Sequence, residues 1–183
     1  MTSQPNHPTS SHANFLARTV VVIPALNEAG CVAGTVQHWR THGVARVRVV
    51  DNDSTDDTAT IARGEGAEVL IEPQRGYGAA AWAGTRDLPP NIEWIFFSSA
   101  DGSDRLDQEA AARFQTEIDH GAVLVLGERV TRPESRRRLS PPQRFGNALC
   151  CALIALGWGR RFRDMASPRA MRRRSVLSSV MAA

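Results

Sequence analysis

Short runs of apolar, largely β-branched residues recur along the chain as far as residue 127, and stretches with helical spacing separate them. Runs of four to eight such residues between turn signals are typical of buried strands. The predicted strands cover residues 19–24, 45–50, 68–71, 93–97 and 122–127, and the predicted helices cover 29–41, 57–64, 79–84 and 106–120. This alternation predicts an α/β fold with a mainly parallel central sheet and right-handed crossovers.

The pattern is different at the two ends of the chain. Residues 1–14 are polar and lack the apolar core of a signal peptide, and we predict a disordered tail over residues 1–16 before a single domain at 17–183. The Arg- and Pro-rich stretch 128–143 is predicted to be a mobile loop. An amphipathic-to-apolar helix follows at 144–158, too short in its apolar part to span a bilayer, and a basic segment at 160–174 contains one carboxylate, Asp164.

The second predicted strand ends in an acidic turn at residues 51–58, with the sequence DNDSTDDT. Polar turns at the carboxyl ends of parallel strands lie where open α/β sheets bind ligands. Asp51 and Asp53 have the spacing to bracket a ribose or the imide face of a pyrimidine. A turn that only caps the next helix explains the same residues, so the pattern leaves both interpretations open. A calcium loop is excluded, because Asp56 stands where glycine is needed and Ala62 where glutamate is needed.

Two more polar turns follow predicted strands. Residues 75–78 form a glycine turn before a helix, which offers backbone N–H groups to a phosphate, although a plain tight turn explains it equally well. It is not a dinucleotide fingerprint, because Ala81 stands where the third glycine is required. The later turn contains Asp101 and Asp104 with hydroxyls nearby, hard oxygen donors that suit Mg²⁺ or Mn²⁺ together with diphosphate oxygens.

Charge is distributed unevenly along the chain. All 22 basic residues are Arg. Residues 1–128 hold 9 Arg and 17 acidic residues, a net charge of −8, whereas residues 129–183 hold 13 Arg and 2 acidic residues, a net charge of +11. A GC-rich coding bias explains the absence of Lys but not this segregation. Guanidinium groups suit phosphate, so the basic part indicates an anionic substrate or a membrane surface. Nucleic acid is not an expected partner, because aromatic residues are only 6% of the chain and are not interleaved with the Arg runs.

Six segments form an ordered series of motifs. They are VVIPALNE at 21–28, DNDSTDDT at 51–58, RGYGAAAWAG at 75–84, SADGSD at 99–104, GER at 127–129 and DMASPRAMRR at 164–173. The series resembles the family 2 glycosyltransferases, particularly the branch that charges polyprenyl phosphates, such as dolichyl-phosphate mannose synthase. Ser99 stands where the D-x-D motif of that family has its first Asp. The resemblance covers about residues 18–176 and implies a GT-A-type, Rossmann-like α/β/α sandwich.

The resemblance also implies roles for individual residues. The nucleotide would be bound by Pro24, Ala25, Asn27, Glu28, Asp51, Asp53, Arg75, Gly76 and Ser99. Mg²⁺ or Mn²⁺ would be held by Asp101 with Ser103 or Asp104 and would neutralise the donor diphosphate. The acceptor phosphate would be bound by Arg129, Arg136 and Arg169. The catalytic set would be Asp101, Asp164 and Arg169, with Asp164 as the base for a hydroxyl acceptor.

These features predict inverting, metal-dependent transfer of a hexose from a nucleotide sugar, of the UDP-glucose or GDP-mannose type, to a polyprenyl or dolichyl phosphate. A phosphate monoester is already a dianion at neutral pH, so such an acceptor needs no general base. We expect a cytoplasmic protein, peripheral to the inner face of the plasma membrane. Two alternatives stay open: a same-fold transferase with a soluble hydroxyl acceptor, and an inactive nucleotide-sugar-binding remnant. The oligomeric state is not predicted.

Overall fold

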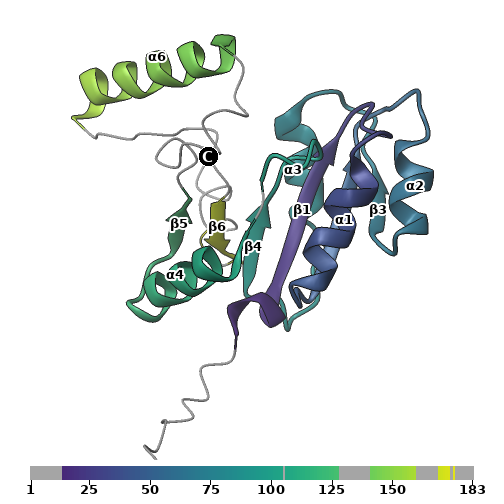
Figure 1. Ribbon diagram of the computed structural model, residues 1–183, viewed down its shortest axis with the longest axis horizontal. Helices are drawn as coiled ribbons and strands as arrows, with labels where there is room; N and C mark the ends of the chain where they lie inside the picture. The colour runs from purple at the N-terminus through teal and green to yellow at the C-terminus, as the bar shows by residue number, and fades with distance from the viewer. Residues whose placement is uncertain (1–13, 105, 128–140, 160–168, 174, 176–183) are drawn as a thin grey trace, which may run out of the picture.

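The computed structural model describes residues 14–104, 106–127, 141–159, 169–173 and 175, and its elements follow the predicted order (Figure 1). The strands are β1 (Thr19–Ala25), β2 (Arg46–Asp51), β3 (Glu68–Ile71), β4 (Trp94–Phe97), β5 (Leu124–Leu126) and β6 (Arg169–Arg172). The helices are η1 (Phe15–Arg18), α1 (Val32–Thr41), α2 (Thr58–Gly64), α3 (Tyr77–Thr85), α4 (Gln108–Asp119) and α6 (Pro141–Trp158). The five predicted strands and the predicted helices are therefore confirmed, with ends displaced by a few residues.

The six strands form one sheet in the order β3-β2-β1-β4-β6-β5. β1 pairs in parallel with β2 and β4, and β2 pairs in parallel with β3, so the mainly parallel sheet is confirmed. β6 is antiparallel to both of its neighbours, with Phe97 opposite Arg169 and Val125 opposite Ala170. The sequence analysis assigned this segment only as basic. β6 reads RAMR, and its strand conformation depends on two neighbours that are remote in sequence rather than on a local apolar run.

Helices cover both faces of the sheet. Along β1, alternate residues point to opposite faces. Val21 and Ile23 lie in the core cluster that also contains buried residues of α1, α2 and α4, whereas Val20 and Val22 lie in the cluster that contains Ala80 of α3. The structure therefore has three layers: α1, α2 and α4 on one face, the sheet in the middle and α3 on the other face. The predicted α/β/α sandwich is confirmed.

The amino-terminal boundary of the folded part differs from the prediction. Residues 1–13 lie outside the described part, but Phe15 and Leu16, which the sequence analysis placed in the tail, are buried in the core. Phe15 stacks on Phe114 of α4 with ring centroids 6.3 Å apart, and Asn14 accepts a hydrogen bond from the N–H of Leu16. The predicted boundary was therefore wrong by two residues, because Phe15 and Leu16 directly follow a polar run and were assigned to the tail with it.

α3 packs very closely on the sheet. A Cβ atom at Gly84 would lie 2.3 Å from Val22 Cγ1, so no larger residue fits without movement. The buried side chain of Arg48 in β2 donates hydrogen bonds to the carbonyl oxygens of Gly84 (3.1 Å) and Arg86 (2.6 Å) and forms an ion pair with Glu68 (2.7 Å). These contacts fix the carboxyl end of α3 and thereby the turn at its start.

α6 stands clear of the sheet in Figure 1. Its predicted existence is confirmed, although it begins at Pro141, inside the predicted loop, whose residues 128–140 lie outside the described part. Phe145, Leu149, Leu153 and Leu156 are exposed, at spacings of four, four and three residues that place them on one face. Within the described residues, neither α6 nor another helix is long and apolar enough to cross a bilayer.

Candidate functional site

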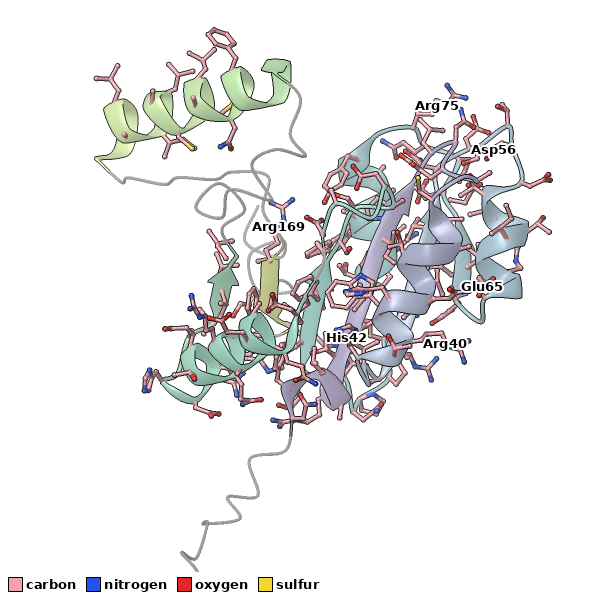
Figure 2. The ribbon with its side chains drawn as sticks, viewed as in Figure 1. Arg40, His42, Asp56, Glu65, Arg75 and Arg169 are labelled. Atoms are coloured by element: carbon pink, nitrogen blue, oxygen red, sulfur yellow. The ribbon has the colours of Figure 1, made fainter. Side chains whose placement is uncertain are left out.

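The loops that follow β1, β2 and β4 meet at the carboxyl edge of the sheet. β1 is the strand from which the sheet order runs in both directions, to β2 on one side and β4 on the other, and such a switch point forms a crevice in open α/β sheets. Figure 2 shows Asp56, Arg75 and Arg169 toward this edge, with Arg40 and His42 near the opposite end. All the predicted site residues within the described part come from the ends of β1 and β2, from the loops after β1, β2, β3 and β4, or from the start of β6.

The acidic turn holds a buried carboxylate with unused hydrogen-bonding capacity. Asp51 is only 5% exposed, and its Oδ2 accepts a long hydrogen bond from the N–H of Ser54 (3.4 Å). Its Oδ1 has no hydrogen-bond partner within the described part of the chain. A buried acceptor without a donor is unfavourable, so this oxygen is suited to receive an N–H or O–H from a ligand.

Asp53 lies next in the same turn with a backbone φ of 66°, a conformation that non-glycine residues seldom adopt. Its Oδ2 accepts a hydrogen bond from Arg75 Nε at 2.9 Å, and both side chains are exposed. Asp53 and Arg75, two predicted nucleotide-binding residues from different loops, are therefore brought into contact.

The carboxylate of Asp56 is used in hydrogen bonds within the protein and is not available to a ligand. Its carboxylate accepts hydrogen bonds from the N–H and hydroxyl of Thr58 and from the N–H of Ala29 (3.1 Å). These contacts, the Thr58 hydroxyl foremost, hold the pKa of Asp56 below its ordinary value. Asp56 therefore fits the interpretation of the acidic turn as a cap for α2, whereas Asp51, with its unpartnered Oδ1, is the residue to which the ligand-binding prediction applies.

Asn27 joins the loop after β1 to the acidic turn. Its Oδ1 accepts hydrogen bonds from the N–H (2.9 Å) and hydroxyl (3.2 Å) of Thr55, and its N–H donates to Ser54 Oγ (3.0 Å). The side-chain oxygen is already engaged, so Asn27 shapes the crevice wall. Pro24 and Ala25 end β1 beside this bridge, with Ala25 opposite Asp51 in the strand register.

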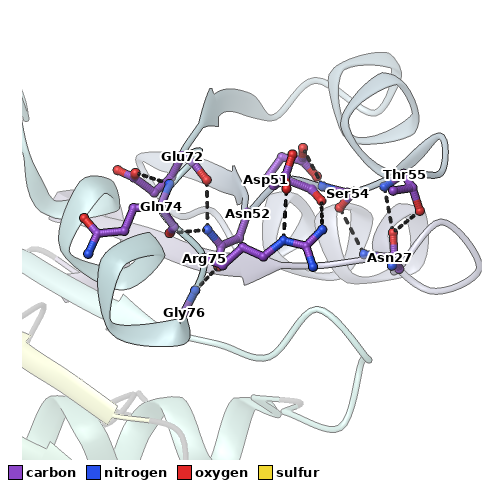
Figure 3. A network of polar contacts seen from close by, with 10 residues as sticks. Asn27, Asp51, Asn52, Ser54, Thr55, Glu72, Gln74, Arg75 and Gly76 are labelled. Carbon is purple, nitrogen blue, oxygen red and sulfur yellow. Dashed lines mark hydrogen bonds and ion pairs between the residues drawn. The ribbon is translucent and has the colours of Figure 1, made fainter.

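Asn52 is a structural centre of the site that the sequence analysis missed (Figure 3). The amide is buried, and its Nδ2 donates to the carbonyl oxygens of Glu72 (2.8 Å) and Gln74 (2.7 Å), while its Oδ1 accepts from the N–H of Gly76 (2.7 Å). Three hydrogen bonds thereby hold the loop that presents Arg75. The N–H of Gly76, which the sequence analysis offered to a phosphate, is engaged within the protein.

The turn after β4 presents Asp101 to solvent and buries Asp104. Asp101 Oδ1 accepts a hydrogen bond from the N–H of Ser103 (2.9 Å), and Asp104 Oδ2 accepts one from the N–H of Ser99 (2.7 Å). Among the described residues, no group of three or more His, Cys, Asp and Glu side chains converges. The oxygen ligands of the exposed Asp101 and the partly exposed Ser103 fit a hard divalent cation that takes further ligands from a diphosphate, whereas Asp104 is buried.

Glu28, in the loop after β1, is affected by carboxylates of both acidic turns. Partial burial raises the pKa of its carboxyl group, and the negative charges of Asp101 and Asp56 raise it further. Three carboxylates that repel one another at one edge of the sheet create a local field favourable to a cation.

Arg169 brings positive charge to the same edge as the first residue of β6. Its Nη2 lies 3.2 Å from the hydroxyl of Tyr77 at the start of α3, and its guanidinium carbon lies 5.9 Å from the ring centroid of Phe97. The ring and the hydroxyl hold the guanidinium near the glycine turn. The other predicted basic and catalytic residues, Arg129, Arg136 and Asp164, lie outside the described residues.

A mainly parallel sheet with polar loops at its switch point is the architecture of an α/β protein of the GT-A type. The fold matches the crystal structure of glucosyl-3-phosphoglycerate synthase from Mycobacterium tuberculosis in complex with Mn²⁺, UDP and glucosyl-3-phosphoglycerate. The TM-score is 0.60 at 20% identity, over 93% of this chain and 64% of that chain. The glycosyl transferase family 2 model matches residues 20–181, and the chain belongs to this family of glycosyltransferases.

Two curated relatives lie within the same family. The chain is 35% identical over 163 residues to an uncharacterized glycosyltransferase of Mycobacterium tuberculosis, covering 86% of this chain and 68% of the relative. It is 28% identical over 162 residues to a dolichyl-phosphate hexose transferase of Haloferax volcanii, covering 87% of this chain and 68% of the relative. The chain thus spans about two thirds of the length of these proteins and of the matched crystal structure.

Proposed function

We propose that the chain transfers a hexose from a nucleoside diphosphate sugar to a polyprenyl phosphate at a membrane surface, with inversion and with the aid of Mg²⁺ or Mn²⁺. The observation that supports this most is the division of charge at one sheet edge. Asp51, Asp53, Glu28 and Asp101 lie at or after the carboxyl ends of β2, β1 and β4, and Arg169 lies beside the start of α3. One edge therefore offers oxygen acceptors for a nucleoside and a cation, and a guanidinium for a phosphate.

The donor nucleoside occupies the acidic turn in this proposal. The free Oδ1 of Asp51 accepts a hydrogen bond from an imide N–H of the base, which favours a uracil nucleotide. Asp53 faces the ribose hydroxyls, and the three hydrogen bonds of Asn52 keep Arg75 next to Asp53. Asp101 and Ser103 hold the cation, which when bound neutralises charge on the departing diphosphate.

The acceptor phosphate binds Arg169, whose fork of N–H groups matches phosphate oxygens. A phosphate dianion is nucleophilic without deprotonation, so the described part of the site needs no base for this acceptor. The relative from Haloferax volcanii, a dolichyl-phosphate hexose transferase, supports an acceptor of this class.

A membrane location is supported by α6 and its sequence neighbours. The exposed apolar stripe of Phe145, Leu149, Leu153 and Leu156 suits the acyl boundary of a bilayer, and Arg-rich stretches precede and follow the helix in sequence. A helix with this combination lies in the interface of anionic membranes. Such a location would place the site within reach of a lipid phosphate.

The experiment that tests the donor part is titration calorimetry with UDP, GDP and their hexose conjugates, with and without Mn²⁺. The wild type is compared with Asp101→Ala, with Asp119→Ala on the exposed end of α4 as the control. We expect Mn²⁺-dependent binding of a uracil nucleotide that Asp101→Ala weakens at least tenfold and Asp119→Ala leaves unchanged. Binding that ignores both Mn²⁺ and Asp101 would favour the remnant interpretation.

The acceptor is tested separately, with labelled nucleotide sugar and either a short polyprenyl phosphate or soluble 3-phosphoglycerate. We expect label to move into the organic phase only with the lipid phosphate. The matched crystal structure contains glucosyl-3-phosphoglycerate, so the same-fold soluble-acceptor alternative predicts a water-soluble product instead. Product in the aqueous phase alone would contradict the lipid acceptor while leaving the donor assignment intact.

A further inference from the structure

The inner face of α1 carries two buried polar side chains that both point to the turn containing Asp101. Thr35 is 3% exposed, and its hydroxyl donates to the carbonyl oxygen of Ala100 (2.9 Å), which is nearer than the carbonyl oxygen of Cys31 within α1 (3.3 Å). Trp39 is fully buried, and its indole N–H donates to Ser98 Oγ (3.0 Å). An apolar helix face would pack equally well against this sheet, so the polar groups are explained by the turn rather than by the core.

These contacts secure the turn on the side away from the crevice. Ala100 directly precedes Asp101, and its carbonyl oxygen receives the Thr35 hydroxyl in a buried environment. Gly102 has a φ of +71°, and a Cβ atom there would lie 3.5 Å from Thr35 Oγ1. The Thr35 hydroxyl is therefore close to the turn at Gly102 as well. Thr35 thus binds the backbone just before Asp101 and lies close to the position of Gly102 just after it.

Asp104 binds the N–H of Ser99, and Asp101 binds the N–H of Ser103, so both hydrogen bonds connect residues within the turn. The N–H of Ser98 donates to the carbonyl oxygen of Val22 in β1 (3.0 Å), and the N–H of Leu106 lies 3.2 Å from His38 Nε2 of α1, so both ends of the segment are held. Between these ends, the hydrogen bond from Thr35 to Ala100 connects the turn to α1. α1 also begins just after Glu28, whose pKa is affected by Asp101, so one helix supports both acidic loops.

We propose that Thr35 is a positioning residue for Asp101, acting through the carbonyl group of Ala100, and that it determines the affinity of the site for the divalent cation. The inference rests on the proposed function, in which Asp101 holds that cation. Loss of the hydroxyl leaves the Ala100 carbonyl without its donor, and the peptide before Asp101 becomes free to rotate. The carboxylate then samples several directions, and cation affinity falls while the nucleoside pocket at Asp51 stays intact.

The test compares Thr35→Val, which keeps the shape and removes the hydroxyl, with Thr35→Ser, which keeps the hydroxyl. Thr41→Val is the matched control, because the Thr41 hydroxyl lies on the same helix but binds the carbonyl of His38 within it. Two readouts are made on each full-length variant: Mn²⁺ affinity in the presence of saturating UDP, and hydrogen exchange of the peptide containing Ala100–Ser103. UDP affinity without metal is measured as the reference.

We expect Thr35→Val to weaken Mn²⁺ binding about tenfold, the size of one hydrogen bond, and to speed exchange in the turn. Metal-free UDP affinity should stay within about twofold, and Thr35→Ser and Thr41→Val should resemble the wild type in both readouts. Equal effects of Thr35→Val and Thr41→Val, or a parallel loss of metal-free UDP binding, would overturn the proposal.

Failure of the proposed function gives a different result. A wild type without Mn²⁺-dependent UDP binding would remove the metal role of Asp101, and with it the claim about cation affinity. Hydrogen exchange would still show whether Thr35 orders the turn. Unchanged exchange in Thr35→Val, in a wild type that does bind Mn²⁺ with UDP, would reject Thr35 while leaving the metal site in place.

Discussion

Glu28 is a carboxylate that the fold keeps in an unfavourable electrostatic position. Its pKa lies above the ordinary value of 4.5, so the ionised form is less favourable in the folded chain than in the unfolded one. The unfavourable contribution is absent when the group is protonated in both states and appears as the pH rises through the ordinary value and then the raised value. The site thus carries an electrostatic strain that a bound cation would relieve.

Glu28→Gln should therefore stabilise the ligand-free protein at neutral pH, by about 2 °C in Tm, with the gain fading below about pH 4.5. Thermal unfolding followed across this range by circular dichroism measures the effect. Glu117→Gln, an exposed residue of α4, serves as the control. A gain of the same size at low and neutral pH would show that the effect of Gln is not electrostatic.

Asn52 illustrates a residue whose role depends on the direction of its hydrogen bonds. Two of its three partners are carbonyl oxygens, so Asn52→Asp replaces a donor by a charged acceptor in a buried place. We expect a loss of about 2–4 kcal/mol in the free energy of unfolding, measured by urea denaturation. Asn91→Asp, at an exposed position before β4, should change it by less than about 0.5 kcal/mol. Similar losses in both variants would reject this role for Asn52.

The contrast between Asp51 and Asn52 shows what sequence can and cannot predict at this scale. Asp51 and Asp101 can be proposed as site residues from sequence because carboxylates at strand ends are chemically informative wherever the loops lie. The role of Asn52 depends on backbone carbonyl groups 20 and 22 residues away, which leave no mark in the sequence. For the same reason, sequence could not separate Asp56, which supports its own turn, from Asp51.

At the scale of elements, α3 contains two glycines with different surroundings. The Cβ atom of Gly84→Ala would collide with Val22 and approach Val50, whereas a Cβ at Gly78 meets nothing within 4 Å. We expect Gly84→Ala to lower the free energy of unfolding by about 3 kcal/mol. Gly78→Ala should be neutral or stabilising by about 0.5 kcal/mol. Urea denaturation of the pair measures both, and equal tolerance would contradict the close packing of α3 on β1.

The strands β1 to β5 were predictable because each has a local signal, an apolar run of its own. β6 has none: only Ala170 and Met171 are apolar, and arginines stand at both ends. It becomes a strand because β4 and β5 leave a gap that an antiparallel segment fills. Its first residue is Arg169, so the guanidinium reaches the crevice through a pairing that no local pattern specifies.

At the scale of the whole molecule, we expect the acidic part of the sequence to bind the nucleotide and cation and the basic part to bind the membrane surface. The described site is largely acidic, while most arginines after residue 128 flank α6 in sequence. We expect the wild type to sediment with anionic vesicles and to dissociate as salt rises, because Coulomb attraction over a Debye length is screened. Vesicles of neutral lipid should retain much less protein.

Substitution of Leu149 and Leu153 by Ser should weaken vesicle binding on the order of tenfold, since each removes apolar area from the exposed stripe of α6. Val123→Ser, an equally exposed apolar position next to β5, is the control. Undiminished binding of the double variant would mean that the arginines alone, and not α6, attach the protein to the lipid.

The late position of β6 along the chain also determines the order in which the sheet can be assembled. During synthesis, β1 to β5 emerge from the ribosome first, but within the described sheet β5 pairs only with β6. Until residues 169–172 arrive, one side of β4 remains an open edge that can pair with a strand of another nascent chain. The segment that brings Arg169 to this edge therefore also closes the sheet, so chains that end before residue 169 lose this arginine and will also be prone to aggregate.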